Sequence, residues 1–228
     1  MEYINTKGIV LSTMKYKESS VISRIYTEKL GLRSYLVHGV RSSRNRKTQK
    51  AALFQPLNLL DLQVTERPLK ELQQIKGGNI LYPMLDCRTN IIKGSILLFL
   101  TEVLSKVLKE EQENPTLFLY LQQSLIIFDK LQKHFANFHL QFLLNLPDYL
   151  GLTINEAKSL YTEQRIHDHP ELDKTINQLL QTPFDEYIPL NQQQRSEVLD
   201  HIIRFYQYHF QSFDYPKSLE ILKEVLSA

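Results

Sequence analysis

The chain has 228 residues, of which 43% are hydrophobic and 23% charged, and this is the composition of an ordinary globular protein with a substantial core. Its formal net charge of +2 conceals an asymmetry. Residues 1–80 hold 14 Lys and Arg against 6 Asp and Glu, a net charge of +8, whereas residues 81–228 hold 13 against 19, a net charge of −6. The basic first part favours a polyanion as partner, and the acidic remainder favours a different partner.

Several classes of protein are disfavoured by what the sequence lacks. Cys87 is the only cysteine, which excludes an intrachain disulfide and a thiolate metal cluster. Residues 1–7 do not resemble a signal peptide, and the longest apolar run, residues 96–100, is too short to span a bilayer. No P-loop, GxGxxG, HExxH or GxSxG motif occurs. We therefore expect a cytoplasmic protein that uses no cofactor and is not an enzyme.

The first eighty residues contain short apolar or alternating runs separated by turns. Ser20 to Thr27 alternates, with Val21, Ser23 and Ile25 on one face, and Gly31 follows as a turn residue able to take a positive φ. Five strands are predicted: residues 8–11, 20–27, 31–40, 57–64 and 69–75. Five short strands at this spacing predict a closed barrel of the OB-fold type over residues 1–80.

Beyond residue 80 the apolar positions recur every three or four residues, as in amphipathic helices. Gly77-Gly78 and then Pro83 mark the junction. Helices are predicted over residues 90–109, from Asn114-Pro115, over 135–150 with an interruption at Pro147, around 172–180, from Asn191 with capping-box spacing, and after residue 218. The predicted fold class is thus α+β multidomain, an OB-fold barrel followed by an all-α domain over residues 81–228.

A cationic loop, defined as residues 41–50, lies between two β-like runs and contains no acid. Its cations could each neutralise a phosphate: Arg41, Arg44, Arg46, Lys47 and Lys50. A solvated loop without a ligand is the alternative explanation of such a charge run. Arg24 and Arg33 lie on predicted strands, where a groove could present them to the same polyanion.

Aromatic and histidine residues offer weaker signals. Tyr26, Tyr35 and Phe54 could stack on bases, as OB-folds do on single strands, but each also suits a core position. His167 and His169 could supply two metal ligands, yet no third ligand is evident, so no metal is predicted. The histidines in the predicted helices, His139 among them, suit partly buried structural roles.

A set of short motifs in a specific order resembles the RecO family of bacterial recombination mediators. The motifs are Gly8-Ile9-Val10-Leu11, Tyr16-Lys17-Glu18-Ser19-Ser20, Tyr26-Thr27 with Gly31, Gly39-Val40-Arg41-Ser42-Ser43-Arg44 and Leu53-Phe54-Gln55-Pro56-Leu57. Residues 138–151 resemble the family's helix ending in Leu-Gly, and His209 with Pro216-Lys217-Ser218-Leu219-Glu220-Ile221-Leu222 resembles its C-terminal signature. The similarity covers nearly the whole chain.

This resemblance implies an N-terminal OB-fold and a helical C-terminal domain. It also implies binding of single- and double-stranded DNA, annealing of complementary strands, and assistance in loading RecA onto DNA coated by single-strand-binding protein (SSB). RecR and the acidic C-terminal tail of SSB are the implied partners. Many family members carry a four-cysteine zinc site after the Leu-Gly helix, but residues 152–183 contain no cysteine, so zinc is not carried over.

Binding of the SSB tail requires an apolar pocket with a cation at its rim for the terminal carboxylate. Arg204 and Phe205 in one helix, followed by Lys217, offer both kinds of group. A solvated surface position is the alternative explanation for either cation. Two other functions remain open from sequence alone. A basic barrel also suits RNA, and an enzyme could be built from scattered residues that form no motif.

Overall fold

The computed structural model describes residues 3–40, 51–67, 70–109, 112–161 and 169–227. The chain divides into two compact units. The barrel unit comprises residues 1–85 and 101–125, and the helical unit comprises residues 86–100 and 126–228. The last strand of the barrel ends at Tyr82, and the assignment of separate domains to residues 1–80 and 81–228 stays a prediction.

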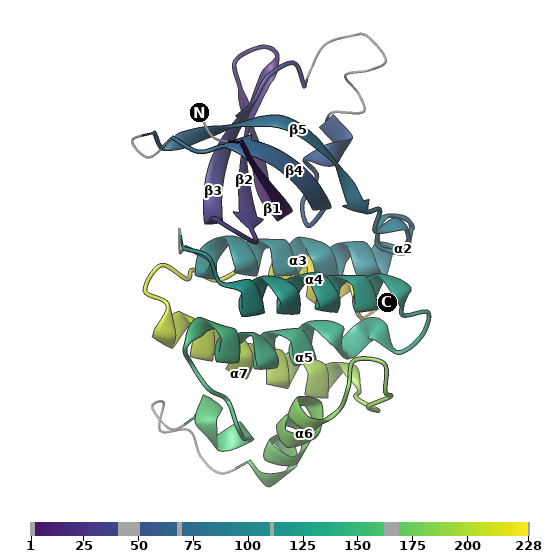
Figure 1. The fold of residues 1–228 in the computed structure, drawn as a ribbon. Coiled ribbons are helices and arrows are strands. Elements are labelled where there is room, and N and C mark those ends of the chain that lie inside the picture. Colours follow the sequence, from purple (N-terminus) through teal and green to yellow (C-terminus); the bar gives the residue numbers. More distant parts are fainter. Residues whose placement is uncertain (1–2, 41–50, 68–69, 110–111, 162–168, 228) are drawn as a thin grey trace. The chain divides into compact units, whose positions relative to one another are not determined.

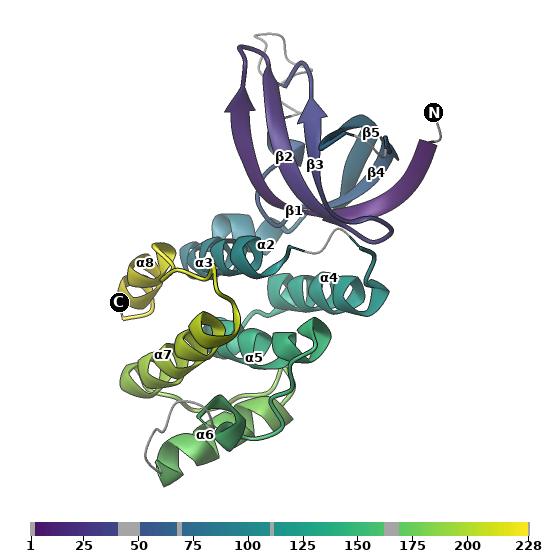
Figure 2. The ribbon, with the colours of Figure 1, turned by 90° about the vertical axis from the view of Figure 1, so that its left-hand side faces the viewer.

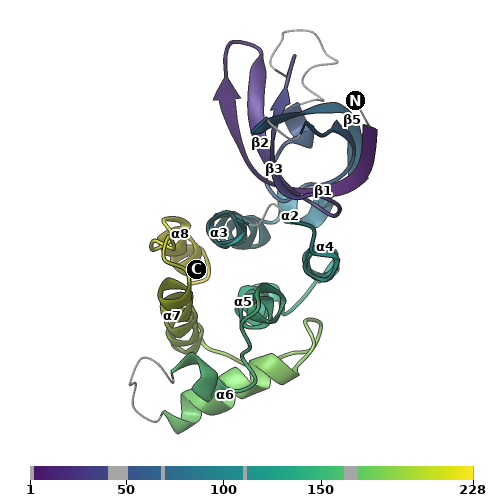
Figure 3. The ribbon, with the colours of Figure 1, turned by 60° about the vertical axis from the view of Figure 1, so that its left-hand side comes forward.

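The barrel contains five strands: β1 (Tyr3–Tyr16), β2 (Ser20–Thr27), β3 (Gly31–Val37), β4 (Leu59–Thr65) and β5 (Leu72–Tyr82). They close into a barrel in the order β1-β2-β3-β5-β4. Figure 3 looks into this barrel close to end-on. The long strand β1 closes the barrel because its first half pairs with β4 and its second half with β2. β3 and β5 pair in parallel, and the other pairs are antiparallel. This topology confirms the predicted OB-fold class.

The face of β2 that the sequence pattern predicts to be buried is buried in the structure. Val21, Ser23 and Ile25 are buried, and Val21 and Ile25 belong to the barrel core. The core contains Val10, Val21, Ile25, Tyr35, Val37, Val40, Phe54, Leu60, Leu62 and Val64. Gly31 takes the predicted positive φ, at 63°. The strand predicted over residues 8–11 is much longer, because it pairs with two neighbours along 14 residues.

Gly77 and Gly78 do not mark a junction between domains, and that prediction is wrong. Both lie within β5, opposite Gln63 and Leu62 of β4. A Cβ at Gly78 would stand 2.7 Å from Leu62 Cδ2 and 3.2 Å from the Asp61 carbonyl oxygen, whereas a Cβ at Gly77 would meet nothing within 4 Å. Gly78 is therefore required by the close approach of β4, and the helical part begins only after β5 ends.

The helices are α2 (Leu85–Thr89), α3 (Ile91–Val107), α4 (Pro115–Lys130), α5 (Phe138–Asn145), α6 (Pro170–Gln181), α7 (Gln192–His209) and α8 (Ser218–Val225), with short 3₁₀ turns at Phe135–Asn137, Leu146–Leu150 and Ala157–Leu160 (Figures 1 and 2). Three of the α-helices have an N-terminal side-chain cap. Asn90 Oδ1 accepts from the backbone N–H of Ile92, and Asn114 Oδ1 accepts from that of Leu117. Asn191 forms the predicted capping box with Gln194.

The helical unit contains a completely buried cation. Lys93 Nζ pairs with the carboxylate of Asp86, donates to the carbonyl oxygen of Asp129 at 2.9 Å, and lies 5.1 Å from the centre of the Phe135 ring. The Asp129 carboxylate accepts from the backbone N–H of Cys87 at 2.8 Å. These bonds compensate the loss of hydration that a buried ammonium suffers. They connect α2, α3 and the end of α4.

Within the described ranges, no helix is both long and apolar enough to cross a membrane.

Candidate nucleic-acid interface

The barrel unit carries an open pocket of about 570 Å³ whose walls are mostly polar and charged. Five cations line it, together with the carboxylates of Glu66 and Glu71. The cations are Arg24, Arg33, Arg67, Lys70 and Lys109. This set is called the cation pocket below. Its charged side chains carry an excess of three positive charges, which suits an anionic ligand.

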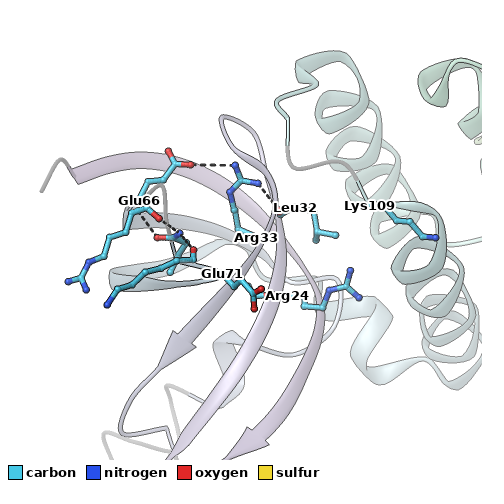
Figure 4. Close-up of a pocket in the computed structure, with 10 residues that line it drawn as sticks. Arg24, Leu32, Arg33, Glu66, Glu71 and Lys109 are labelled. Carbon is cyan, nitrogen blue, oxygen red and sulfur yellow. Dashed lines mark hydrogen bonds and ion pairs between the residues drawn. The ribbon is translucent and has the colours of Figure 1, made fainter.

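Strand pairing positions the first two cations. Arg24 on β2 lies directly opposite Ser34 on β3, and Ser34 in turn pairs with Leu72 at the start of β5. Arg33 precedes Ser34, and its guanidinium forms an ion pair with Glu66 at 3.4 Å and donates to the Leu32 carbonyl oxygen at 3.1 Å. Figure 4 shows Arg33 reaching toward Glu66, while Arg24 and Lys109, which line the same pocket, lie on the other side of Arg33. Arg24 and Arg33, both proposed from sequence, are thus brought together.

The connection between β4 and β5 adds Arg67 and Lys70. The buried side chain of Gln73 holds this connection, because its Oε1 accepts from the Arg67 backbone N–H at 2.8 Å. Its Nε2 donates to the carbonyl oxygens of Arg67, at 3.0 Å, and Lys70, at 2.6 Å. One amide therefore fixes the backbone at two of the five cations.

Sequence reasoning missed Arg67, Lys70 and Lys109. The first two lie in the charged segment that joins β4 to β5, and Lys109 follows the end of α3. The alternation of charge at Glu66-Arg67 and Lys70-Glu71, on either side of a proline, is a signal for an exposed turn. This segment comes near Arg24 because β5 pairs with β3, which in turn pairs with β2. Since β3 and β5 are not consecutive strands, no local signal in the sequence predicts that pairing.

The three aromatic residues considered for base stacking belong to the interior instead. Tyr35 and Phe54 are members of the barrel core. Tyr26 is 1% exposed, with its ring stacked on that of Phe118 at a centroid distance of 6.3 Å. Burial also raises the pKa of the Tyr35 hydroxyl above its ordinary value. A base cannot reach rings that are already covered, so the stacking hypothesis is wrong for these residues.

The cationic loop lies outside the described residues, and so do His167 and Asp168. The contribution of Arg41, Arg44, Arg46, Lys47 and Lys50 therefore stays a prediction. In the part of the chain that the structure describes, no group of three His, Cys, Asp or Glu residues is arranged to hold a metal ion.

The residues predicted to bind a protein partner occupy different environments. Arg204 on α7 and Lys217 at the start of α8 are exposed, whereas Phe205 is 4% exposed and lies against the rings of Tyr206 and His209. Phe205 thus supports the packing of α7 from inside the helical unit. Partner binding at these three residues stays a prediction.

Two family models match this chain in succession. The model of the Recombination protein O N terminal region matches residues 1–84, which include all five strands, and that of the C terminal region matches residues 88–170. The chain belongs to the RecO family.

Curated proteins named DNA repair protein RecO agree with this membership over almost their entire length. The protein of Christiangramia forsetii is 34% identical over 237 residues, which cover 97% of this chain and 98% of that protein. The protein of Flavobacterium johnsoniae is 34% identical over 237 residues, covering 98% and 99%. The protein of Bacteroides fragilis is 34% identical over 238 residues, covering 96% and 98%. The RecO family chain described here is therefore a DNA repair and recombination protein.

Proposed function

We propose that this RecO family chain is a mediator without a catalytic centre, which binds single- and double-stranded DNA through the cation pocket. The observation that carries the proposal is the gathering of five cations from β2, β3, the β4–β5 connection and the segment after α3. Such cations release counterions from DNA when they neutralise its phosphates, which gives affinity without reading sequence.

The cationic loop is proposed to add further phosphate contacts through Arg41, Arg44, Arg46, Lys47 and Lys50. A protein that holds two strands by their phosphates leaves the base edges accessible, and this property supports annealing of complementary strands. The proposal extends to assistance in loading RecA onto SSB-coated DNA, with RecR as a partner.

The acidic helical part is proposed to contact proteins rather than DNA, because like charge repels the phosphate backbone. Its proposed partner is the acidic C-terminal tail of SSB, with Arg204 and Lys217 as the cations that attract the tail. Phe205 would act by fixing the position of Arg204 on α7, since its own ring is buried.

Two variants of equal charge test the cation pocket. The first carries Arg24→Gln, Arg67→Gln and Lys109→Gln. The matched control carries Lys7→Gln, Lys29→Gln and Lys76→Gln, three cations of the barrel unit that do not line the pocket. The pocket variant should bind single-stranded DNA about a hundredfold more weakly, and its log–log salt slope should flatten by about 2, because each lost contact removes about 0.7.

The control variant should keep the wild-type salt slope, with a small loss of affinity from its lower net charge. An equal loss in the two variants would mean that the pocket is not the binding site. Competition by RNA of the same sequence distinguishes DNA binding from the alternative function, because an RNA-binding protein would prefer the competitor that carries 2′-hydroxyl groups.

A further inference from the structure

The cation pocket lies on the outer face of the barrel. Arg24 and Ser34, which both line it, lie directly opposite each other on β2 and β3, and Ser12 of β1 lies opposite Arg24 on its other side. Residues directly opposite each other on antiparallel strands share one face of the sheet. Because the adjacent residues Ser23 and Tyr35 are completely buried, this shared face is the outer one.

Apolar side chains occupy the next positions on the same outer face. Two residues further along the strands, Met14, Ile22 and Leu36 form a second row in register with one another. Tyr16 follows Met14 by two residues on β1 and lies opposite Ser20. Met14 is 57% exposed and Tyr16 36%, whereas Ile22 and Leu36 are half-buried. The side chains of Met14, Tyr16, Ile22 and Leu36 are called the apolar strip below.

The apolar strip has cations at both ends. Arg24 and the cation pocket lie at one end. At the other end, the turn between β1 and β2 presents the exposed Lys17, whose Nζ lies 5.5 Å from the centre of the Tyr16 ring. The exposed Lys15 precedes Tyr16, and Glu18 is the acid of this turn.

This order of groups fits a single strand of nucleic acid. A surface for single strands combines cations that contact the phosphates with aromatic or apolar side chains on which unpaired bases stack. The rows of Arg24 and Met14 are about 6.6 Å apart, because each residue of a strand rises about 3.3 Å. Neighbouring groups of one strand can therefore place a phosphate at Arg24 and a base on Met14.

We propose that the apolar strip stacks on the unpaired bases of single-stranded DNA whose phosphates lie in the cation pocket. This inference rests on the function proposed above and adds to it the group that distinguishes single from double strands. The bases of a duplex are covered by their neighbours in the stack, so the strip contributes nothing to duplex binding. Single exposed apolar residues are common on protein surfaces, but these four are contiguous and continue a cationic site.

An oligonucleotide without bases separates stacking from phosphate contacts. Oligothymidylate and an abasic strand of the same length carry the same phosphates, so the wild-type chain should bind both with the same salt slope. It should bind oligothymidylate at least about tenfold more tightly, because only this strand offers bases for stacking. Equal affinity for the two strands would overturn the strip and leave phosphate binding intact. Failure to bind either strand would overturn the proposed function as well.

Variants of unchanged charge locate the stacking residue. Tyr16→Ser should weaken binding of oligothymidylate about tenfold and leave duplex affinity and the salt slope as in wild type, whereas Tyr16→Trp should restore the affinity. Tyr3→Ser is the matched control, because Tyr3 is exposed on the same strand but lies opposite Thr65, outside the strip. It should bind both DNAs as wild type does.

Melting temperatures establish that the variants are folded. Wild-type affinity for oligothymidylate in folded Tyr16→Ser, or an equal loss of duplex affinity, would overturn the proposal. If Tyr16→Ser keeps its DNA affinity but sediments as a smaller species than wild type, the strip contacts a second copy of the chain, which would also overturn it.

Discussion

A pocket of the barrel unit and the interior of the helical unit hold cations in different surroundings. In the barrel unit, Arg24 and Lys109 line an open pocket of about 570 Å³ that contains more cations than acids. In the helical unit, Lys93 is completely buried between Asp86 and the Asp129 carbonyl oxygen, and Arg195 lines an apolar pocket of about 90 Å³. Lys109 is thus an exposed cation, whereas Lys93 is enclosed by protein.

This difference determines what each cation can do. A solvated cation exchanges small counterions for phosphate at little cost, and its attraction for DNA falls steeply with added salt. A buried cation has already lost its hydration and depends on fixed partners, so it contributes to stability. Counting charges along the chain separates the units by sign but does not distinguish these roles.

The largest expected effect follows from removing the partner of the buried cation. Asp86→Asn leaves the Lys93 ammonium buried without its carboxylate, and the free energy of unfolding should fall by about 3 kcal/mol. Chemical denaturation of the variant measures this loss. Asp148→Asn, an exposed acid of the same unit, should change stability by less than about 0.5 kcal/mol. Equal losses in the two variants would show that Asp86 does not hold Lys93.

The next effect concerns pH. Burial, with a smaller contribution from Arg195, lowers the pKa of His139 from 6.5 to about 3. The unfolded ring therefore binds a proton below pH 6.5 while the folded ring does not until about pH 3, and stability falls as the pH falls through this window. Between pH 7 and pH 5 this effect amounts to roughly 2 kcal/mol.

Denaturation of wild type and His139→Leu at both pH values isolates the contribution of this ring. The variant should lose roughly 2 kcal/mol less than wild type on acidification. His134→Asn, which removes an exposed histidine of the same unit, should keep the wild-type dependence. An unchanged pH dependence in His139→Leu would mean that the ring is solvated in the folded protein.

A comparable effect is expected in the barrel from a single methyl group. Gly78→Ala places a Cβ 2.7 Å from Leu62 Cδ2 and should destabilise the protein by about 1–2 kcal/mol. Gly77→Ala is the matched control, because it adds the same atom where no other atom lies within 4 Å. Thermal denaturation should rank Gly78→Ala clearly below Gly77→Ala. The reverse order would contradict the close approach of β4 and β5.

The smallest expected effect is a loss of DNA affinity when the residue that holds part of the cation pocket is changed. Gln73→Leu removes the three hydrogen bonds that fix Arg67 and Lys70, so both cations lose their preorganised positions. Affinity for single-stranded DNA should fall about tenfold, which corresponds to roughly 1.4 kcal/mol. Gln74→Leu changes the adjacent residue, which does not line the pocket, and should bind as wild type does. Equal binding by both variants would remove Gln73 from the interface.

Local signals predicted most of the elements correctly, because each such element is determined by neighbouring residues. The alternation at Val21, Ser23 and Ile25 predicted β2 with its observed bounds, and the caps at Asn114 and Asn191 predicted where two helices begin. Local signals failed where a distant segment decides the outcome. The sequence around Gly78 suggests a junction, but this glycine is required by Leu62, which lies on another strand. A local pattern does not contain that contact.

The sequence by itself determined the order of a basic barrel and an acidic helical part, together with the motifs that identify the family. It predicted Arg24 and Arg33 because both lie on recognisable strands. Only the tertiary structure decided that Tyr26 is covered by Phe118, and that Arg67, Lys70 and Lys109 join Arg24 in one pocket. The physical reason is that burial and the local electric field depend on contacts between residues far apart in sequence, and no short window contains both partners.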